Sequence, residues 1–358
     1  MKLTNKGKKV AKAYLINLIV IVALYLLLNQ LVAGRVLSRT MQGIMMLIFI
    51  NIILATSLNL TTGFLGQIAL GHAGFMSIGA YSAALFSLNV TGLPDLARFL
   101  ISLIVGGLIA ALFGLLVGVP ALRLKGDYLA IITLGFGEII RSIIENMPNV
   151  TGGAQGLKGI PKLAKLNIVF LIMVVCVAIM FTFVRSRHGR AITAIREDDI
   201  AASASGINNT YYKVLAFVIA AFFAGVAGGI YAQHYTVLGA ANFNFNKSID
   251  ILVMVVLGGM GSLTGSIVAA IGLTALPELL RVFSDYRMII YSLALILVMI
   301  FKPSGLFGRY EFSLTRVLDQ AWAVITGKTK LTLPPSLAKL WSRVTGKNKA
   351  ETQKEEVK

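Results

Sequence analysis

The chain has 358 residues, of which 57% are hydrophobic and only 13% charged, and its formal net charge is +18. A soluble domain typically carries about 25% charged residues, and a water-soluble protein could not bury this much apolar surface, so the composition indicates a polytopic membrane protein. A single cysteine excludes a disulfide scaffold. Because the basic residues lie mainly at the chain ends and in loops, we attribute the charge to the positive-inside rule and expect no nucleic-acid partner.

Long apolar segments follow one another along the chain, and about 20 such residues cross the hydrocarbon core as a helix. The segments are 14–33, 41–60, 68–90, 99–119, 129–147, 167–184, 214–235 and 286–302. A further stretch, 249–276, is interrupted by glycines. No ten-residue alternation typical of a membrane β-barrel recurs. We therefore predict an all-α, polytopic transmembrane helical bundle of about 8–10 membrane segments.

The basic residues predict the orientation. Residues 1–13 contain five lysines and no acid, so this end should be cytoplasmic. A cleaved signal peptide is the alternative, but the apolar core of 14–33 is too long for one. Counting helices then places the loops around 123–125 and 185–213 inside. Two groups of basic residues oppose the positive-inside rule, because this count places them on the outer side of the membrane. They are Arg35 with Arg39, and the lysines of the loop 148–165.

The C-terminal region is also basic, with 11 Lys or Arg against five Asp or Glu from Lys302 onward. We expect the extension 309–358 to be cytoplasmic and to lie on anionic lipid. The stretch 249–276 must then cross an even number of times, as a re-entrant hairpin or as two short helices meeting at the glycine break. A kinked single helix is the alternative. Irregular backbone at membrane depth lines a cavity or is buried in protein, so Gly258, Gly259 and Gly261 are candidate pathway residues.

A second glycine-rich segment spans 61–81. Its glycines weaken a helix, and free backbone groups with polar side chains can contact a small solute. The candidate pathway residues here are Gly66, Gln67, Gly71, His72 and Gly74. The alternative for His72 is a hydrogen bond between helices.

Charged residues recur at Glu138, Arg141 and Glu145, on one helix face. They form either a self-neutralising ladder near a helix end or a polar pathway lining, for which Glu138 and Arg141 are the candidates. A proton relay is a third option, which the arginine disfavours.

Two ladders of small residues occur at four-residue spacing, which lets helix backbones approach closely. They are Gly106, Ala110, Gly114 and Gly118, and Ala221, Gly225 and Gly229. They serve either packing within the chain or a seam between subunits.

Enzymatic motifs are absent from the sequence. Thr326-Gly327-Lys328-Thr329 resembles the end of a phosphate-binding loop, but Trp322 stands where that motif needs its first glycine. The three histidines have no metal-ligand spacing. We therefore expect no catalytic or metal site, no enzyme activity and no cofactor in this chain.

The loop 185–213 is the longest polar connection. Glu197, Asp198 and Asp199 should start a short helix, where carboxylates complement the helix dipole, and Gly206 can end it in a left-handed conformation. A short helix with an apolar patch, held between two membrane helices, is suited to dock a motor subunit.

Several motifs together resemble one family. Ile200-Ala201-Ala202 followed by Gly206 is similar to the EAA-x-x-x-G loop of ABC importer permeases, although Ile200 replaces the namesake glutamate. Residues 66–73, 126–131, 194–202, 257–262 and 302–306 further resemble the M-type permease of branched-chain amino acid ABC importers. The resemblance covers residues 43–308, in consistent order, and implies a transmembrane permease domain over 14–308.

This resemblance implies a set of partners. They are a homologous H-type permease, two ATPase subunits that bind the ATP and Mg, and an extracytoplasmic substrate-binding protein that delivers leucine, isoleucine or valine. The residues expected to couple to the ATPase are Arg196, Glu197, Asp198, Asp199, Ile200, Ala201, Ala202 and Gly206. The protein would lie in the bacterial inner membrane with both termini cytoplasmic. The alternatives are a permease for urea or short amides, an ion-coupled secondary transporter that uses Glu138 or the glycine break, and a membrane scaffold without a transported substrate.

Overall fold

The computed structural model describes residues 19–30, 34, 38–122, 124, 126–280, 286–302, 304–308 and 311. The chain divides into two units, one of residues 24–311 and one of residues 1–23 with 312–358. The helices from α2 onward lie in the unit 24–311. The expectations for residues 1–13, for Arg35, and for the tail beyond Glu311 lie outside the described residues.

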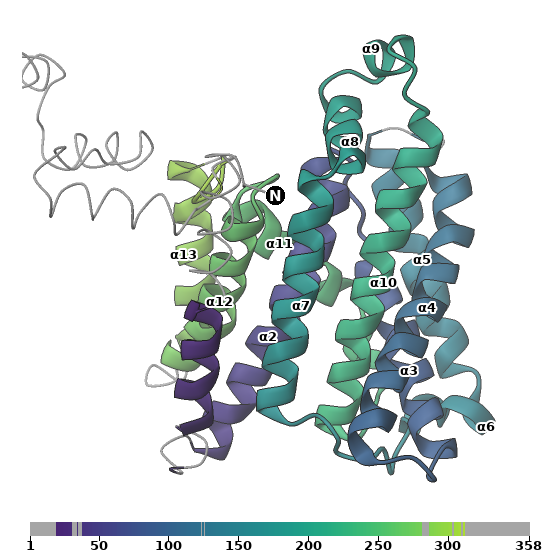
Figure 1. Cartoon of the computed structure of the whole chain (residues 1–358), viewed down its shortest axis with the longest axis vertical. Helices are drawn as coiled ribbons and strands as arrows, with labels where there is room; N and C mark the ends of the chain where they lie inside the picture. The colour runs from purple at the N-terminus through teal and green to yellow at the C-terminus, as the bar shows by residue number, and fades with distance from the viewer. Residues whose placement is uncertain are drawn as a thin grey trace, which may run out of the picture. The chain divides into compact units, whose positions relative to one another are not determined.

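The described residues form helices and contain no strand, which confirms the all-α prediction (Figure 1). A helix of Ile19–Gln30 comes first. The longer helices that follow are α2 (Arg39–Asn59, continued by the π-helical turn η1, Leu60–Phe64), α3 (His72–Asn89), α4 (Asp95–Ala121), α5 (Asp127–Glu145), α7 (Leu166–Arg185), α10 (Asn209–Tyr235), α11 (Phe245–Gly258), α12 (Leu263–Leu279) and α13 (Arg287–Phe301). The shorter ones are α6 (Pro148–Thr151), η2 (Gly153–Gln155), α8 (Arg187–Glu197), α9 (Asp199–Ala204) and η3 (Ala240–Phe243).

Five described helical segments are long and apolar enough to cross a membrane: Arg39–Phe64, Asp95–Ala121, Leu166–Arg185, Asn209–Tyr235 and Ala240–Gly258. Two apolar helices are shorter, Ile19–Gln30 and Leu263–Leu279. The predicted segments 68–90 and 129–147 appear as α3 and α5, which are not among the five.

The tightest packing joins α3, α4 and α10. A Cβ atom at Gly225 of α10 would lie 2.5 Å from the Cβ of Ala110 and 2.7 Å from the carbonyl oxygen of Gly106, both on α4. A Cβ at Gly79 of α3 would overlap the backbone of Gly225. The two small-residue ladders thus meet each other inside this chain, where the backbones touch and dispersion forces hold them.

The stretch 249–276 forms two short helices, α11 and α12, separated by Gly259–Ser262. The helices cross at Gly258, where a Cβ would lie 2.5 Å from the carbonyl carbon of Gly265. The glycine break predicted here is therefore present. The predicted segment 68–90 began too early, because Gly66 has φ +77° and α3 starts only at His72.

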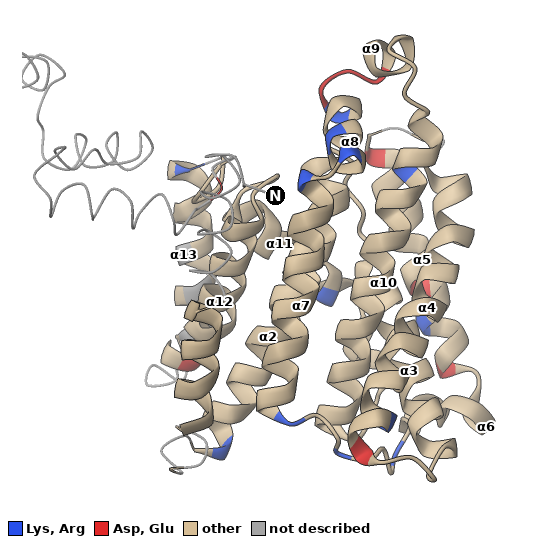
Figure 2. Ribbon diagram, viewed as in Figure 1, with Lys and Arg blue, Asp and Glu red and all other residues tan. Residues whose placement is uncertain are grey.

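The basic loops 148–165 and 185–213 lie at opposite ends of the unit 24–311. Helices α8 and α9 stand at one end and α6 at the other (Figure 1). Lys and Arg gather at both ends, while the middle is nearly free of charge (Figure 2). An isolated antiparallel bridge between Leu157 and Leu238 holds the loop 148–165 against the segment that follows α10.

The contacts at Gly225 predict that a methyl group added there destabilises the protein. Gly225→Ala should lower the stability by about 1–3 kcal/mol, because the added methyl would overlap Ala110 Cβ and backbone atoms of Gly106 and Gly107 on α4. Gly272→Ala on α12 is the control, since a Cβ there meets nothing within 4 Å. Thermal unfolding of the detergent-purified protein, followed by circular dichroism, measures both. Equal midpoints for the two variants would contradict the packing.

Candidate functional site

The loop 185–213 contains two helices, whereas the sequence predicted one. Glu197 ends α8 and does not begin the next helix, so that part of the prediction is wrong. The chain turns at Asp198, whose extended backbone (φ −155°, ψ 112°) interrupts the helix. The Asp198 carboxylate accepts hydrogen bonds from the amides of Ile200 (2.8 Å) and Ala201 (3.0 Å) and caps α9.

The end of α9 follows the prediction. Gly206 has φ +81°, and the amide of Ile207 donates to the carbonyl of Ala202 at 3.1 Å. This pairing is typical of a glycine-terminated helix, which only a residue tolerant of positive φ allows at low cost.

Polar contacts hold α9 against the start of α10. The Asp199 carboxylate forms an ion pair with Lys213 at 3.0 Å and accepts a hydrogen bond from Asn209 Nδ2 at 2.6 Å. Asp199 therefore has a bracing role within the chain. The outward surface of α9 carries Ile200, which is 80% exposed.

The inward surface of the loop is apolar. A buried cluster contains Leu65, Ile192, Ile195, Ala202 and Ala216, with Phe64, Phe183, Ile207 and Tyr212 packed around it. Leu65 directly follows the π-helical turn η1. The cluster therefore packs both short helices of the loop onto the end of the α2–η1 membrane segment and onto α10.

Arg196, near the end of α8, joins the loop to both glycine breaks. Its Nη1 donates a hydrogen bond to the carbonyl oxygen of Gly63. A Cβ at Gly66 would lie 2.9 Å from Arg196 Cγ, and one at Gly261 would lie 2.8 Å from Arg196 Nη1. One side chain of the coupling set thus reaches three glycines from two membrane segments far apart in sequence.

Asn59 connects the same two breaks from inside the membrane domain. Its side chain is fully buried, and its Nδ2 donates to Ser262 O and to Ser266 Oγ, each at 2.8 Å. Its Oδ1 accepts from the amide of Gly261 at 2.9 Å. Asn59 of α2 thus provides partners for two backbone groups of the break, the Gly261 amide and the Ser262 carbonyl, as a buried break requires.

The residues after α13 also reach this region. The amides of Leu306 and Phe307 donate to the carbonyls of Leu257 (2.7 Å) and Gly258 (3.1 Å). The Glu311 carboxylate accepts from the amide of Leu263 at 2.6 Å, at the start of α12. Burial raises the pKa of Glu311, and the hydrogen bonds from Leu263 and Thr264 oppose that shift. The break between α11 and α12 is therefore fixed from both sides.

The remaining pathway candidates near α3 lie in packed surroundings. His72 is 3% exposed, and its Nε2 lies 2.9 Å from Ser57 Oγ, a hydrogen bond between α3 and α2. A Cβ at Gly71 would overlap the Thr133 carbonyl, and one at Gly74 would lie 2.9 Å from Gly137 Cα. These residues thus join α3 to its neighbours. Gln67 is half-buried, and its Oε1 has no hydrogen-bond partner among the described residues.

The charges of α5 neutralise one another. Arg141 Nε lies 2.8 Å from Glu138 Oε2, and Arg141 Nη1 lies 3.0 Å from Glu145 Oε1. About a third of each side chain is exposed, 29–34%. This arrangement matches the self-neutralising ladder, one of the alternatives open from the sequence.

Sequence reasoning missed a polar group on α11. Lys247 Nζ donates to Asn51 Oδ1 of α2 at 3.3 Å, and Asn51 Nδ2 donates to Thr274 Oγ1 of α12 at 2.9 Å. Asp250 lies one helical turn from Lys247 and is exposed. The signal was available, because charges inside an apolar segment are rare and mark functional or buried positions.

Comparison of the sequence with known protein families identifies the family of this chain. The family described as the permease component of branched-chain amino acid transport systems matches residues 40–301. This chain belongs to that family. The resemblance seen in the motifs is therefore confirmed.

Three relatives show the range of the similarity. LivM of Escherichia coli K12, a high-affinity branched-chain amino acid transport system permease protein, is 37% identical over 303 residues, covering 75% of this chain and 70% of LivM. BraD of Pseudomonas aeruginosa, described in the same words, is 30% identical over 319 residues, 80% of this chain and 98% of BraD. LivH of E. coli K12 is 32% identical over 147 residues, 40% of this chain and 47% of LivH.

The role of Asn59 predicts a stability loss. Asn59→Ala should destabilise the protein by about 1–3 kcal/mol, because the Gly261 amide and the Ser262 carbonyl lose their buried partners. The control is Asn146→Ala, whose side chain makes one exposed hydrogen bond to Ser142 O at 2.8 Å and whose loss should stay within about 0.5 kcal/mol. Thermal unfolding in detergent compares the two, and an unchanged midpoint for Asn59→Ala would refute the role.

Proposed function

We propose that this chain is a permease subunit of an ATP-driven ABC importer for branched-chain amino acids. The observation that carries the proposal is the contact of Arg196, on the exposed docking loop, with the two glycine breaks of the membrane domain. The family and the titles of LivM and BraD support the substrate class. The chain is a multi-pass membrane protein by family and by its apolar helices.

The proposed partners follow from the same arrangement. A homologous H-type permease would complete the pathway, and the similarity to LivH supports a partner of related fold. Two ATPase subunits would dock on α8 and α9 and bind the ATP and Mg, so this chain hydrolyses nothing itself. A substrate-binding protein would deliver leucine, isoleucine or valine at the opposite end. Both termini are then cytoplasmic, in a bacterial inner membrane.

The docking surface has an outward and an inward part. Exposed residues for the ATPase are Glu197, Asp198, Ile200, Ala201 and Gly206, whereas Ala202 is buried. Asp199 braces α9, and Arg196 points inward. Movement of the ATPase would displace α8 and α9 together, because the shared cluster and the ion pair to Lys213 hold them to α10.

The movement of α8 and α9 would be transmitted to the pathway by contacts with its backbone, and not by the protonation of a side chain. Arg196 would pull on the Gly63 carbonyl and on the Gly261 region, and Asn59 would keep these two breaks in register. Glycines at both breaks accept a change in φ and ψ at low cost. An ion-coupled mechanism through Glu138 is disfavoured, since Glu138 is held by Arg141.

Two substitutions in the loop should separate docking from coupling. Ile200→Asp should prevent assembly with the ATPase, because it places a charge in an apolar contact. Arg196→Gln should leave assembly intact but lower ATP-dependent leucine uptake at least tenfold, since a neutral, shorter group cannot hold both breaks. Co-purification and uptake in proteoliposomes are the measurements.

The control for both is Arg190→Gln, an exposed arginine on the same helix whose Nη1 donates to Arg185 O at 3.2 Å. It should keep assembly and uptake. Full uptake by the Arg196→Gln transporter would reject the coupling role, and normal assembly of Ile200→Asp would reject the docking surface.

A further inference from the structure

A basic hollow lies at the end of the helical bundle opposite the docking loop 185–213. Here α2 and α7 begin and α10 ends. It has a volume of about 490 Å³ and is lined by Arg39, Gln42, Gly43, Met46, Lys162, Ala164, Lys165, Leu166, Asn167 and His234. Three of these side chains are basic, and none of the ten is acidic. The cations come from the two outer loops that oppose the positive-inside rule.

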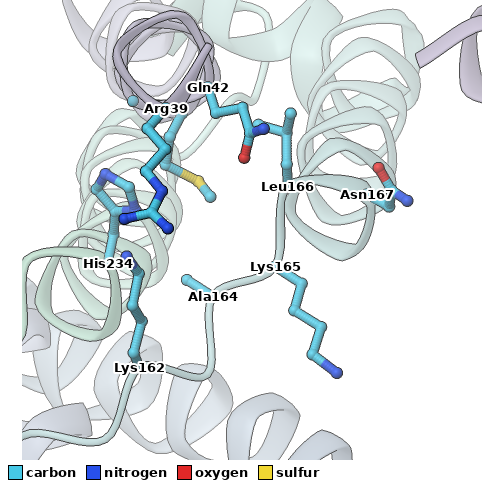
Figure 3. A pocket seen from close by; sticks show the side chains of 10 residues that line it. Arg39, Gln42, Lys162, Ala164, Lys165, Leu166, Asn167 and His234 are labelled. Atoms are coloured by element: carbon cyan, nitrogen blue, oxygen red, sulfur yellow. The ribbon is translucent and has the colours of Figure 1, made fainter. Parts of the chain in front are cut away.

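The hollow lacks an internal counter-charge. Arg39, Lys162 and Lys165 form no ion pair with any described residue. Figure 3 shows Arg39, Lys162 and His234 turned toward one another around the same space. Like charges that converge without an acid repel each other, and an anion between them removes that cost.

Two polar atoms of the lining are also without a partner. His234 Nδ1 and Asn167 Oδ1 are buried and make no hydrogen bond with the part of the chain described. Asn167 is anchored on its other side, because its Nδ2 donates to Asn29 Oδ1 at 2.7 Å. The hollow thus combines cations with a ring nitrogen that has no partner, which suits an anionic ligand. The Asn167 amide lies on the far side of α7 and is turned away from Arg39 and His234 (Figure 3).

A row of exposed apolar side chains, here called the apolar lane, continues from the hollow along α7. Asn167 lines the hollow, and Leu171, Val175 and Ile179 follow it at four-residue steps, on the same helix face. They are 43%, 55% and 51% exposed. The hollow lies at the depth of the lipid headgroups, since it is formed by helix ends, and the lane descends from it into the hydrocarbon region.

We propose that this hollow binds the phosphate group of an anionic glycerophospholipid, with its acyl chains along the exposed face of α7. Arg39 and Lys162 hold the phosphate, and Lys165 adds charge at the rim. The site is separate from the docking loop and does not rest on the importer proposal.

The test is a titration of the full-length protein, purified with its associated subunits and delipidated, followed by native mass spectrometry. Phosphatidylglycerol should bind the wild-type protein and the Lys158→Gln variant alike, because Lys158 is exposed in the same loop but lies outside the hollow. The double variant Arg39→Gln/Lys162→Gln should bind about fivefold more weakly for each lost charge, roughly thirtyfold in all. The charge-conserving double variant Arg39→Lys/Lys162→Arg should retain binding, which separates lost charge from misfolding.

Two further ligands distinguish the sources of the anion. Phosphatidylcholine and inorganic phosphate should each compete poorly with phosphatidylglycerol, because one carries no net charge and the other has no acyl chains. Equal phosphatidylglycerol binding by the Arg39→Gln/Lys162→Gln variant would overturn the proposal. So would full displacement of the lipid by millimolar phosphate.

Discussion

The hydrogen bond from the Arg196 guanidinium to the Gly63 carbonyl is the contact on which the rest of the membrane domain depends. A membrane helix that stops in the middle of its course leaves backbone groups without partners, and lipid offers none. Here a cationic side chain from the docking loop supplies one donor at the first break and packs against Gly261 at the second. The loop that we propose as the ATPase contact and the two glycine breaks are thereby one connected structure.

Around this contact, each break is held by groups from distant parts of the chain. Asn59 of α2 binds the turn between α11 and α12, and Glu311 caps the start of α12 from beyond the last helix. Small residues at the crossing of α3, α4 and α10 form the most tightly packed part of the domain. The domain thus joins a rigid crossing, built of touching backbones, to two glycine breaks whose dihedral angles can change.

Local features of this fold were predictable, and contacts between distant residues were not. The glycine run 258–262 predicted the break between α11 and α12, whereas the glycines of 61–81 predicted only a weakened helix. Gly206 predicted the end of α9 because positive φ favours glycine. The extended turn at Asp198, which splits the loop into two helices, was missed because an aspartate can cap a helix or sit within its first turn. Arg196 and Asn59 reach partners 133 and 202 residues away, and no spacing along the chain reports such a contact. His72 looked like a pathway residue because polar groups in membranes usually are, yet its hydrogen bond to Ser57 satisfies it within the bundle.

The most direct test follows the distance between the loop and the second break through the ATP cycle. Spin labels at Ala204→Cys on α9 and at Met260→Cys, both exposed positions, would be placed in a Cys176→Ala background and measured by pulsed electron paramagnetic resonance in the assembled transporter. The account predicts the same narrow distance distribution with and without ATP, and a broader one when Arg196 is replaced by glutamine. A distance that changes on ATP binding while Arg196 is present would contradict it, because the loop would then move independently of the break.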